Sequence, residues 1–134
     1  MKLFTFLIIL FSALINCDGQ NLIGFKSNEI KSFMSTNRKD MNMDKVVNNS
    51  FRYLKYSDKY DTQTILFFLN PDSVCSYIRM ICNKSIRSEK MKELDSTFTK
   101  SGDNIWTDKH SGRNFLVKLV DEEWSFTVTI ETEK

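Results

Sequence analysis

Hydrophobic and polar positions alternate most regularly near the C-terminus of the chain. From Trp124 to Ile130 every second residue is hydrophobic, and the residues between them are Ser and Thr. A period of two is typical of a strand that turns one face toward the core. The sequence therefore predicts a strand over residues 124–131 and places Trp124 on its buried face.

Three earlier segments also have the composition of strands. Residues 51–57 are rich in aromatic side chains, and residues 62–69 contain a run of five hydrophobic residues that ends at Leu69. Five consecutive hydrophobic residues cannot share one face, so this strand is expected inside the sheet, covered at least partly on both faces. After a turn that Pro71 predicts, residues 74–82 form a third strand, or a helix, because a short hydrophobic run does not define its period.

Two segments show helical spacing instead. The first begins at Ser27, a residue type that caps helices, and fades near Asn37. The second begins at Ser88 and ends before Gly102, which lies where a left-handed C-terminal cap is expected. The stripes expected to face the core are Ile30, Phe33 and Met34 in the first helix and Met91, Leu94 and Phe98 in the second.

Two further strands, over residues 104–108 and 113–120, are expected before the C-terminal strand. The predicted order is therefore α-β-β-β-α-β-β-β, and the sequence shows no internal repeat. This order favours an α+β domain, a two-layer antiparallel sheet with two helices on one face. In topology it resembles the small secretion chaperones, a likeness that concerns the fold alone.

The N-terminus has the pattern of a secretory signal. Lys2 precedes an almost unbroken hydrophobic run over residues 3–15, which is too short to span a bilayer and is followed by small or polar residues. We expect residues 1–19 to be removed as a signal peptide and residues 20–134 to form one exported domain in the periplasm, on the cell surface or in the medium. Cys17 leaves an alternative open, because lipidation of this residue would anchor the protein to the envelope. Only in that case is membrane association expected.

Charge is spread evenly along the chain. The 19 basic and 17 acidic residues give a formal net charge of +2. An even distribution creates no concentrated positive field, so a nucleic-acid partner is disfavoured. The densest basic stretch, residues 84–92, is interrupted by Glu89 and is typical of a solvated helix face.

Two cysteines remain once the signal peptide is removed. Cys75 and Cys82 lie seven positions apart. That spacing separates them by about 23 Å, on opposite faces, along a strand and by about 10 Å along a helix. Both distances exceed the reach of a disulfide. The sequence therefore predicts two free and buried thiols.

The sequence offers little catalytic chemistry. His110 is the only histidine and precedes Ser111 in a segment with turn composition. Glu122 and Glu123 lie in another expected turn, which lacks the hydrophobic walls that general acid catalysis by a carboxyl group requires. We expect no catalytic residue, no metal site and no cofactor. Whether the protein is an enzyme stays open, with a small carboxylate-using hydrolase as the alternative to a binding domain.

A family resemblance adds to the expected location. The features that carry it are Asn21-Leu22-Ile23-Gly24, the hairpin from Phe67-Phe68-Leu69 to Val74-Cys75, and Trp106 and Trp124 flanking residues 113–120. With these features the whole mature chain resembles small exported proteins of the Bacteroidetes type, an uncharacterised group. The resemblance implies a periplasmic or cell-surface location and transfers no catalytic or binding residue.

The expected function is that of a small exported, non-catalytic binding or interaction domain. If helices cover one face of the sheet, alternation over residues 62–69 leaves hydrophobic side chains on the other face. Such a patch commonly marks an interaction site, here for a protein partner or for a second copy of the chain. Residues 38–50, folded across this face, would instead cover it. The candidate binding residues are Tyr53, Tyr56, Phe67, Phe68, Leu116 and Val120.

Overall fold

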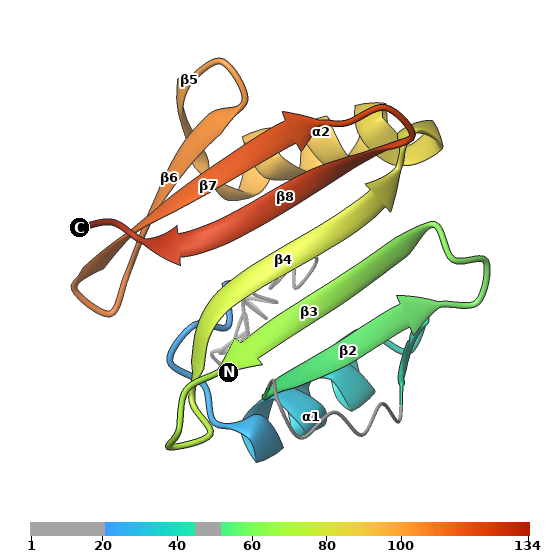
Figure 1. The fold of residues 1–134 in the computed structure, drawn as a ribbon. Helices are drawn as coiled ribbons and strands as arrows, with labels where there is room; N and C mark the ends of the chain where they lie inside the picture. The colour runs from blue at the N-terminus through green and yellow to red at the C-terminus, as the bar shows by residue number, and fades with distance from the viewer. Residues whose placement is uncertain (1–20, 45–51) are drawn as a thin grey trace, which may run out of the picture.

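One antiparallel sheet of eight strands forms the centre of the protein, and two helices pack against it (Figure 1). The computed structural model describes residues 21–44 and 52–134. In chain order the elements are α1 (Ser27–Asn37), β1 (Met41–Met43), β2 (Tyr53–Asp58), β3 (Gln63–Leu69), β4 (Cys75–Asn83), the short 3₁₀ helix η1 (Lys84–Ile86), α2 (Arg87–Thr97), β5 (Thr99–Gly102), β6 (Ile105–His110), β7 (Arg113–Asp121) and β8 (Ser125–Thr132).

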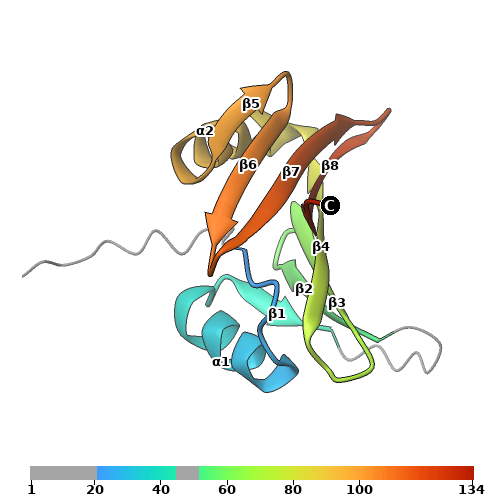
Figure 2. The same cartoon turned by 90° about the vertical axis from the view of Figure 1, so that its left-hand side faces the viewer.

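The sheet consists of two meanders that meet in its middle. The strand order is β1-β2-β3-β4-β8-β7-β6-β5, and every neighbouring pair is antiparallel. The first half of the molecule (α1 and β1–β4) and the second half (α2 and β5–β8) thus have the same arrangement, a helix followed by a four-stranded meander. Figure 2 shows both helices on the same side of the sheet, α1 toward the β1 edge and α2 toward the β5 edge.

The antiparallel sheet and the mixed α+β character are confirmed, whereas the predicted order of elements is wrong. Four strands follow each helix, because β1 lies in the expected connection and β5 contains Gly102, the expected helix cap. These strands have only three and four residues. A segment so short has no readable alternation, and only its pairing with β2 or β6 makes it a strand.

The two helices begin close to the predicted positions but with different caps. Ser27 and Ser88 are already helical, and the N-cap positions are Lys26 and Ile86. At the start of α1, the backbone N–H of Lys26 donates to Oε1 of Glu29 at 3.1 Å. This side-chain bond to the cap backbone fixes the first turn in place of a serine hydroxyl.

The hydrophobic core lies between the sheet and the two helices. Ile30 and Met34 of α1 and Leu94 of α2 are buried against it. Trp106 on β6 is completely buried, and its Nε1–H donates to Oδ1 of Asp95 on α2 at 2.9 Å. This bond satisfies the indole and connects the sheet to the second helix. The largest fully buried strand residues are Trp106, Phe115, Phe126, Ile78, Met80, Ile130, Val117 and Val128.

Trp124 does not belong to this core, so its predicted placement is wrong. Strand β8 begins at Ser125, and Trp124 lies in the preceding turn with 83% of its surface exposed. The backbone N–H of Glu122 donates to the carbonyl of Ser125 at 2.8 Å and closes this turn. The strand and its alternation therefore begin at Ser125, one position after Trp124.

Strand β4 confirms the strand prediction for residues 74–82, but a β-bulge changes its parity. Cys75 and Tyr77 pair with consecutive residues of β3, so Ser76 is an extra residue in the ladder. Cys75 and Cys82 consequently share the buried side of the sheet, not opposite faces as predicted. Both are free thiols, and burial raises the pKa of each to about 11.

Candidate partner-binding face

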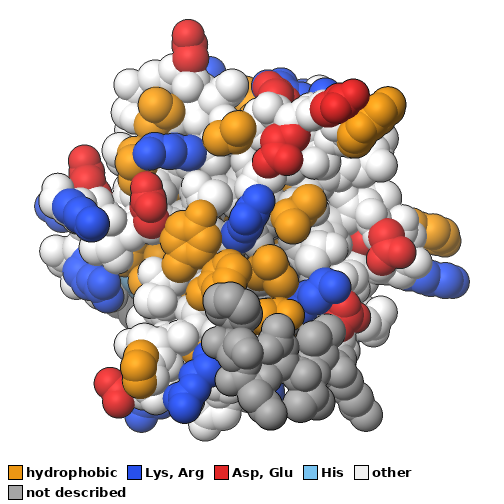
Figure 3. Space-filling view, viewed as in Figure 1, with side chains coloured by type: hydrophobic (Ala, Val, Ile, Leu, Met, Phe, Trp, Pro, Cys, Tyr) orange, Lys and Arg blue, Asp and Glu red, His pale blue; other side chains and the backbone are white. Residues whose placement is uncertain are grey.

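The sheet face away from the helices, called the open face below, exposes a row of aromatic side chains in the first half. The register places Tyr53 of β2 beside Phe68 of β3, and Phe68 beside Tyr77 of β4. Neighbouring ring centroids are 5.9 Å and 5.6 Å apart, with tilted planes. Such packing is favourable between aromatic rings, so the row is ordered before any partner arrives. Figure 3 shows hydrophobic side chains gathered over the middle of this face.

A shallow hollow of about 470 Å³ opens beside this aromatic row. Leu66 and Phe68, which belong to the hydrophobic run of β3, contribute its apolar wall together with Ile81 of β4, which is 37% exposed. Pockets for small molecules have similar volumes but enclose their ligand. An open hollow suits contact with another protein surface better. The full lining is Tyr53, Lys55, Thr64, Leu66, Phe68 and Ile81.

Two lysines of the open face are neutralised by carboxylates. Nζ of Lys55, at the rim of the hollow, lies 3.2 Å from Oδ2 of Asp44. In the second half, Nζ of Lys118 lies 3.6 Å from Oε1 of Glu131. Both pairs are partly exposed, so each contributes little stability, but each removes a free charge from the face.

Arg79 is the charged residue nearest the middle of the sheet. It lies on β4 between Leu66 of β3 and Thr129 of β8, and it is exposed. In the part of the chain that the structure describes, its guanidinium has no ion pair and no hydrogen bond. The hydrophobic patch therefore surrounds a cation without a partner.

Four of the six candidate binding residues lie on the open face. Tyr53 and Phe68 line the hollow. Leu116 and Val120 on β7 lie on the same face in the second half, and Val120 is 53% exposed. Val120 and Ile81 both pair with Thr127 of β8, a residue 5% exposed whose hydroxyl donates to Glu122, so a polar pair separates the hydrophobic residues of the two halves.

The other two candidates, Tyr56 and Phe67, face the core and cannot take part in an open-face site. They are 5% and 2% exposed, and their rings meet edge to face with centroids 5.9 Å apart. The register explains the placement, because Tyr56 pairs with Ile65, whose parity is that of the buried side of β3. Of the two adjacent phenylalanines, Phe68 is the one that faces solvent.

Three open-face residues of β4 were not among the predicted binding residues: Tyr77, Arg79 and Ile81. They alternate with the buried residues Ile78 and Met80. Tyr77 and Ile81 are hydrophobic like the buried residues between them, so residue type does not separate the two faces of this segment. Only Arg79 marks the exposed face, and one polar residue does not define a period.

A pocket of about 180 Å³ tests the alternative of a carboxylate-using hydrolase. It lies where the loop after α1 and the β2–β3 turn meet the start of α2. Lys90, almost completely buried, forms an ion pair with Glu93 at 2.9 Å beside it. The lining residues are Asp40, Asp58, Thr62, Gln63, Ile86, Glu89, Lys90 and Glu93.

The two aspartates of this pocket are poorly suited to general acid catalysis. The hydrogen bond from Arg38 lowers the pKa of Asp40. Partial burial raises the pKa of Asp58. Hydrogen bonds from the Thr62 hydroxyl and the Gln63 backbone together lower it by more, so the net shift of the pKa is downward. A general acid at neutral pH needs a raised pKa. The pocket therefore offers no support for hydrolase activity.

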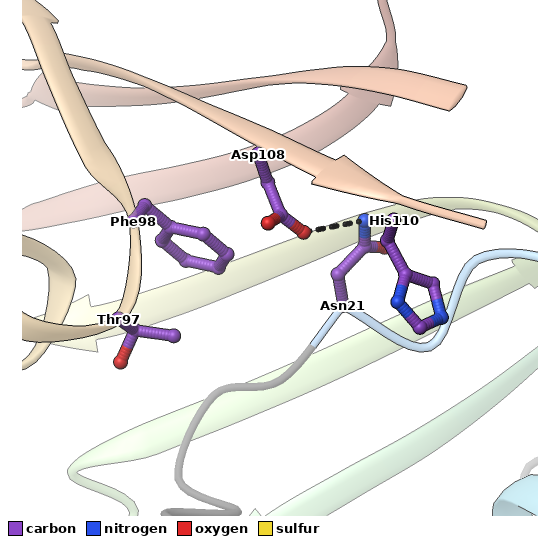
Figure 4. A pocket seen from close by; sticks show the side chains of 5 residues that line it. All are labelled: Asn21, Thr97, Phe98, Asp108 and His110. Atoms are coloured by element: carbon purple, nitrogen blue, oxygen red, sulfur yellow. Dashed lines mark hydrogen bonds between the residues drawn. The ribbon is translucent and has the colours of Figure 1, made fainter. Parts of the chain in front are cut away.

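Figure 4 shows a second polar pocket, of about 210 Å³, with Asn21, Asp108 and His110 at one side and Thr97 and Phe98 at the other. Nδ2 of Asn21 donates to Oδ2 of Asp108 at 3.4 Å. Among residues 21–44 and 52–134, no hydrogen bond orients the His110 ring or joins it to a nucleophile. Catalysis through a nucleophile commonly uses such a bonded pair, and the described residues of this pocket do not form one.

Two further observations concern metals and membranes. Within the described ranges, no three His, Cys, Asp or Glu side chains lie close enough together to hold a metal ion. The helices of the same ranges are not long and hydrophobic enough for any of them to cross a membrane. The expected signal peptide and Cys17 lie outside the described residues.

The fold and the face described above define a one-sheet α+β protein with helices on one side and a hydrophobic hollow on the other. Comparisons with models of protein families, with curated proteins and with solved structures found no match for this chain. The resemblance to exported Bacteroidetes-type proteins stays a prediction. The fold alone does not define a function, which depends on the chemistry of the open face.

Proposed function

We propose that this protein is an exported, non-catalytic interaction domain that binds a protein partner through its open face. In the proposed two-layer arrangement both helices occupy one side of the sheet (Figure 2), which leaves the other side for the partner. Removal of residues 1–19 would release the domain outside the cytoplasm. Lipidation of Cys17 would instead hold the same domain at the membrane, with the open face still available.

The hydrophobic surface on the first half of the open face carries this proposal. There β2, β3 and β4 present Tyr53, Phe68 and Ile81. In the second half, β8 has the central position that corresponds to β4, yet it presents Thr127 and Thr129 on this face. Since β8 takes its central place with threonines, a central strand of this sheet does not require hydrophobic residues on the open face. An exposed hydrophobic patch without a structural cause favours an interaction site.

The edges of the sheet support the open face as the site by being unsuited to strand addition. Edge strand β1 has three residues and β5 has four, Thr-Lys-Ser-Gly. Short edge strands and an edge lysine are the usual protection against pairing with another chain. Neither edge offers a partner the length of ladder that the central strands have.

The substitution Phe68→Lys tests the proposal, with Tyr60→Lys as its matched control. Phe68 lines the hollow, whereas Tyr60 lies in the β2–β3 turn and is 79% exposed. Proteins captured from the native envelope or medium by tagged wild type and variants are quantified by mass spectrometry. We expect one captured protein to fall roughly tenfold or more with Phe68→Lys, as for a binding hot spot, and to stay unchanged with Tyr60→Lys.

Equal capture by Phe68→Lys and wild type, with both folded by circular dichroism, would contradict the open-face proposal. Export is tested separately by N-terminal sequencing of the protein recovered outside the cytoplasm. A chain that begins at Gln20 supports cleavage of residues 1–19, and acylated Cys17 supports the lipid-anchored form. A recovered chain that begins at Met1 contradicts both.

A further inference from the structure

We infer that the partner contacts the open face with an acidic segment, in which a carboxylate lies among hydrophobic side chains, and that Arg79 receives this carboxylate. The inference rests on the proposed function and adds to it the chemistry of the partner. It begins from the position of Arg79 on β4, in register with Leu66 on one side and Thr129 on the other. Figure 3 shows blue Lys and Arg side chains among the orange ones in the middle of this face.

The cost of burying an unpaired guanidinium decides what can cover this face. Arg79 adjoins the hollow, because it pairs with Leu66 and lies two residues before Ile81 on β4. A partner that fills the hollow and extends over β4 therefore also removes water from Arg79. A buried charge without a counter-charge strongly opposes association. A purely hydrophobic partner surface is therefore disfavoured, and a surface with an anion is favoured.

Among the described residues, no carboxylate is placed beside Arg79, and those nearest to it on the open face are already engaged; Glu122 accepts a hydrogen bond from the Thr127 hydroxyl. Along β8, the carboxylate nearest to Arg79 in register is Glu131, two positions beyond Thr129 on the same face, and it is already paired with Lys118. At the other end of the hollow, Asp44 is paired with Lys55. The partner therefore has to provide the carboxylate. The planar guanidinium of Arg79 matches a carboxylate with two parallel hydrogen bonds.

The same charge argues against a second copy of this chain as the occupant. A two-fold dimer centred on the hollow presents each surface to itself. Two Arg79 side chains would then approach each other, and the nearby carboxylates of each copy are already engaged: Asp44 and Glu131 form ion pairs, and Glu122 accepts a hydrogen bond from the Thr127 hydroxyl. Charge complementarity thus favours a different protein, one whose contact segment combines acidic and hydrophobic residues.

Selection from a random displayed peptide library tests the inference without knowledge of the natural partner. Peptides are selected on the wild-type protein and counter-selected on Phe68→Lys, and are then titrated against Arg79→Glu and Lys92→Glu. Lys92 is an exposed residue of α2, on the other side of the sheet, so its reversal changes net charge equally. We expect the selected peptides to be enriched in Asp or Glu beside hydrophobic residues and to bind Arg79→Glu roughly tenfold or more weakly. Binding to Lys92→Glu should stay close to wild type.

A second selection on Arg79→Glu should enrich Lys or Arg at the position where the first enriched Asp or Glu. Peptides that require Phe68 but show no acidic preference would overturn the inference about Arg79 and leave the proposed function standing. Failure to select any peptide that distinguishes wild type from Phe68→Lys would count against both. A concentration-dependent dimer that Arg79→Glu strengthens would overturn the inference and indicate a second copy of the chain as the occupant. Binding to phosphatidylglycerol vesicles, with no peptide selected, would indicate an anionic membrane surface instead.

Discussion

The first and second halves of the sheet have the same topology but different open faces. Each half is a helix followed by a four-stranded meander, and the last strands, β4 and β8, pair in the middle. On the buried side the halves are alike, with Ile78 and Met80 of β4 opposite Ile130 and Val128 of β8. On the open side an aromatic row covers β2–β4, whereas threonines predominate on β8.

This difference distinguishes the hydrophobic residues that the fold requires from those that it does not require. A half-sheet with one solvated face normally alternates hydrophobic and polar residues, as β8 does. The strand β3 departs from this rule, because Leu66 and Phe68 are hydrophobic on the side that no helix covers. The central strand β8 therefore acts as an internal control for β4, and the aromatic row of β2–β4, which has no counterpart on β7 or β8, supports the proposed binding role. Three measurements test this comparison, in order of decreasing effect.

The largest effect is expected from truncating the two neighbouring phenylalanines of β3. Phe67→Ala removes a ring that is 2% exposed and should lower the free energy of unfolding by about 3–5 kcal/mol. Phe68→Ala removes a ring from the open face and should cost about 1 kcal/mol. Urea denaturation at equilibrium measures both. Similar losses from the two variants would mean that the open face of the first half is part of the core.

An intermediate effect is expected from the two tryptophans of the second half. Trp106→Phe removes the indole N–H that donates to Asp95 and leaves a small cavity, with an expected loss of about 1–3 kcal/mol. Trp124→Phe changes a side chain that is 83% exposed and should stay within about 0.5 kcal/mol of wild type. Denaturant midpoints of the two variants give the comparison. A large loss from Trp124→Phe would show that the β7–β8 turn packs against something.

The smallest effect concerns acid, and its direction should be the same in both halves. Hydrogen bonds from Arg38 lower the pKa of Asp40 in the first half, and hydrogen bonds from Arg87 lower the pKa of Asp121 in the second. A carboxylate with a pKa below its usual value near 3.8 stabilises the folded state above about pH 4. That contribution is lost as the pH falls through the lowered pKa.

Asp40→Asn and Asp121→Asn should each be slightly less stable than wild type at pH 7 and nearly equal to it at pH 2.5. Urea denaturation at the two pH values measures this convergence. Solvent screening keeps the effect small, because the Asp40 and Asp121 side chains are 60% and 44% exposed, although the Arg38 side chain is only 9% exposed. If either variant stays equally destabilised at pH 2.5, its aspartate acts through something other than the arginine pair.

Much of the local structure could be predicted from the sequence. The helical spacing that ended near Asn37 matches the end of α1, and the turn at Pro71 separates β3 from β4 as expected. Ser111 and Gly112 form the β6–β7 turn with φ angles of 52° and 73°. Positive φ at both positions suits a tight hairpin, and the turn composition of this segment predicted it. In each case the signal lies in neighbouring residues, which interact locally.

The candidate site was only partly predictable. The hydrophobic run of β3 indicated that one alternate set of residues would face away from the helices, but it did not say which set. Phe68 and Tyr53 proved to be on that side, and Phe67 and Tyr56 on the other. Arg79 was missed because its significance depends on which side chains of other strands surround it and on the carboxylates that are already paired.

The sequence by itself determined where the helices, the central strands and most turns lie, because spacing and backbone preference act over a few residues. The tertiary structure decided the rest. Strands β1 and β5 exist only through their partners, and the bulge at Ser76 brought Cys75 and Cys82 to the same side. The repeated topology of the two halves also emerged only there, without any repeat in sequence. The physical reason is that strand pairing joins residues far apart in the chain, and a register shift of one residue moves every side chain to the opposite face.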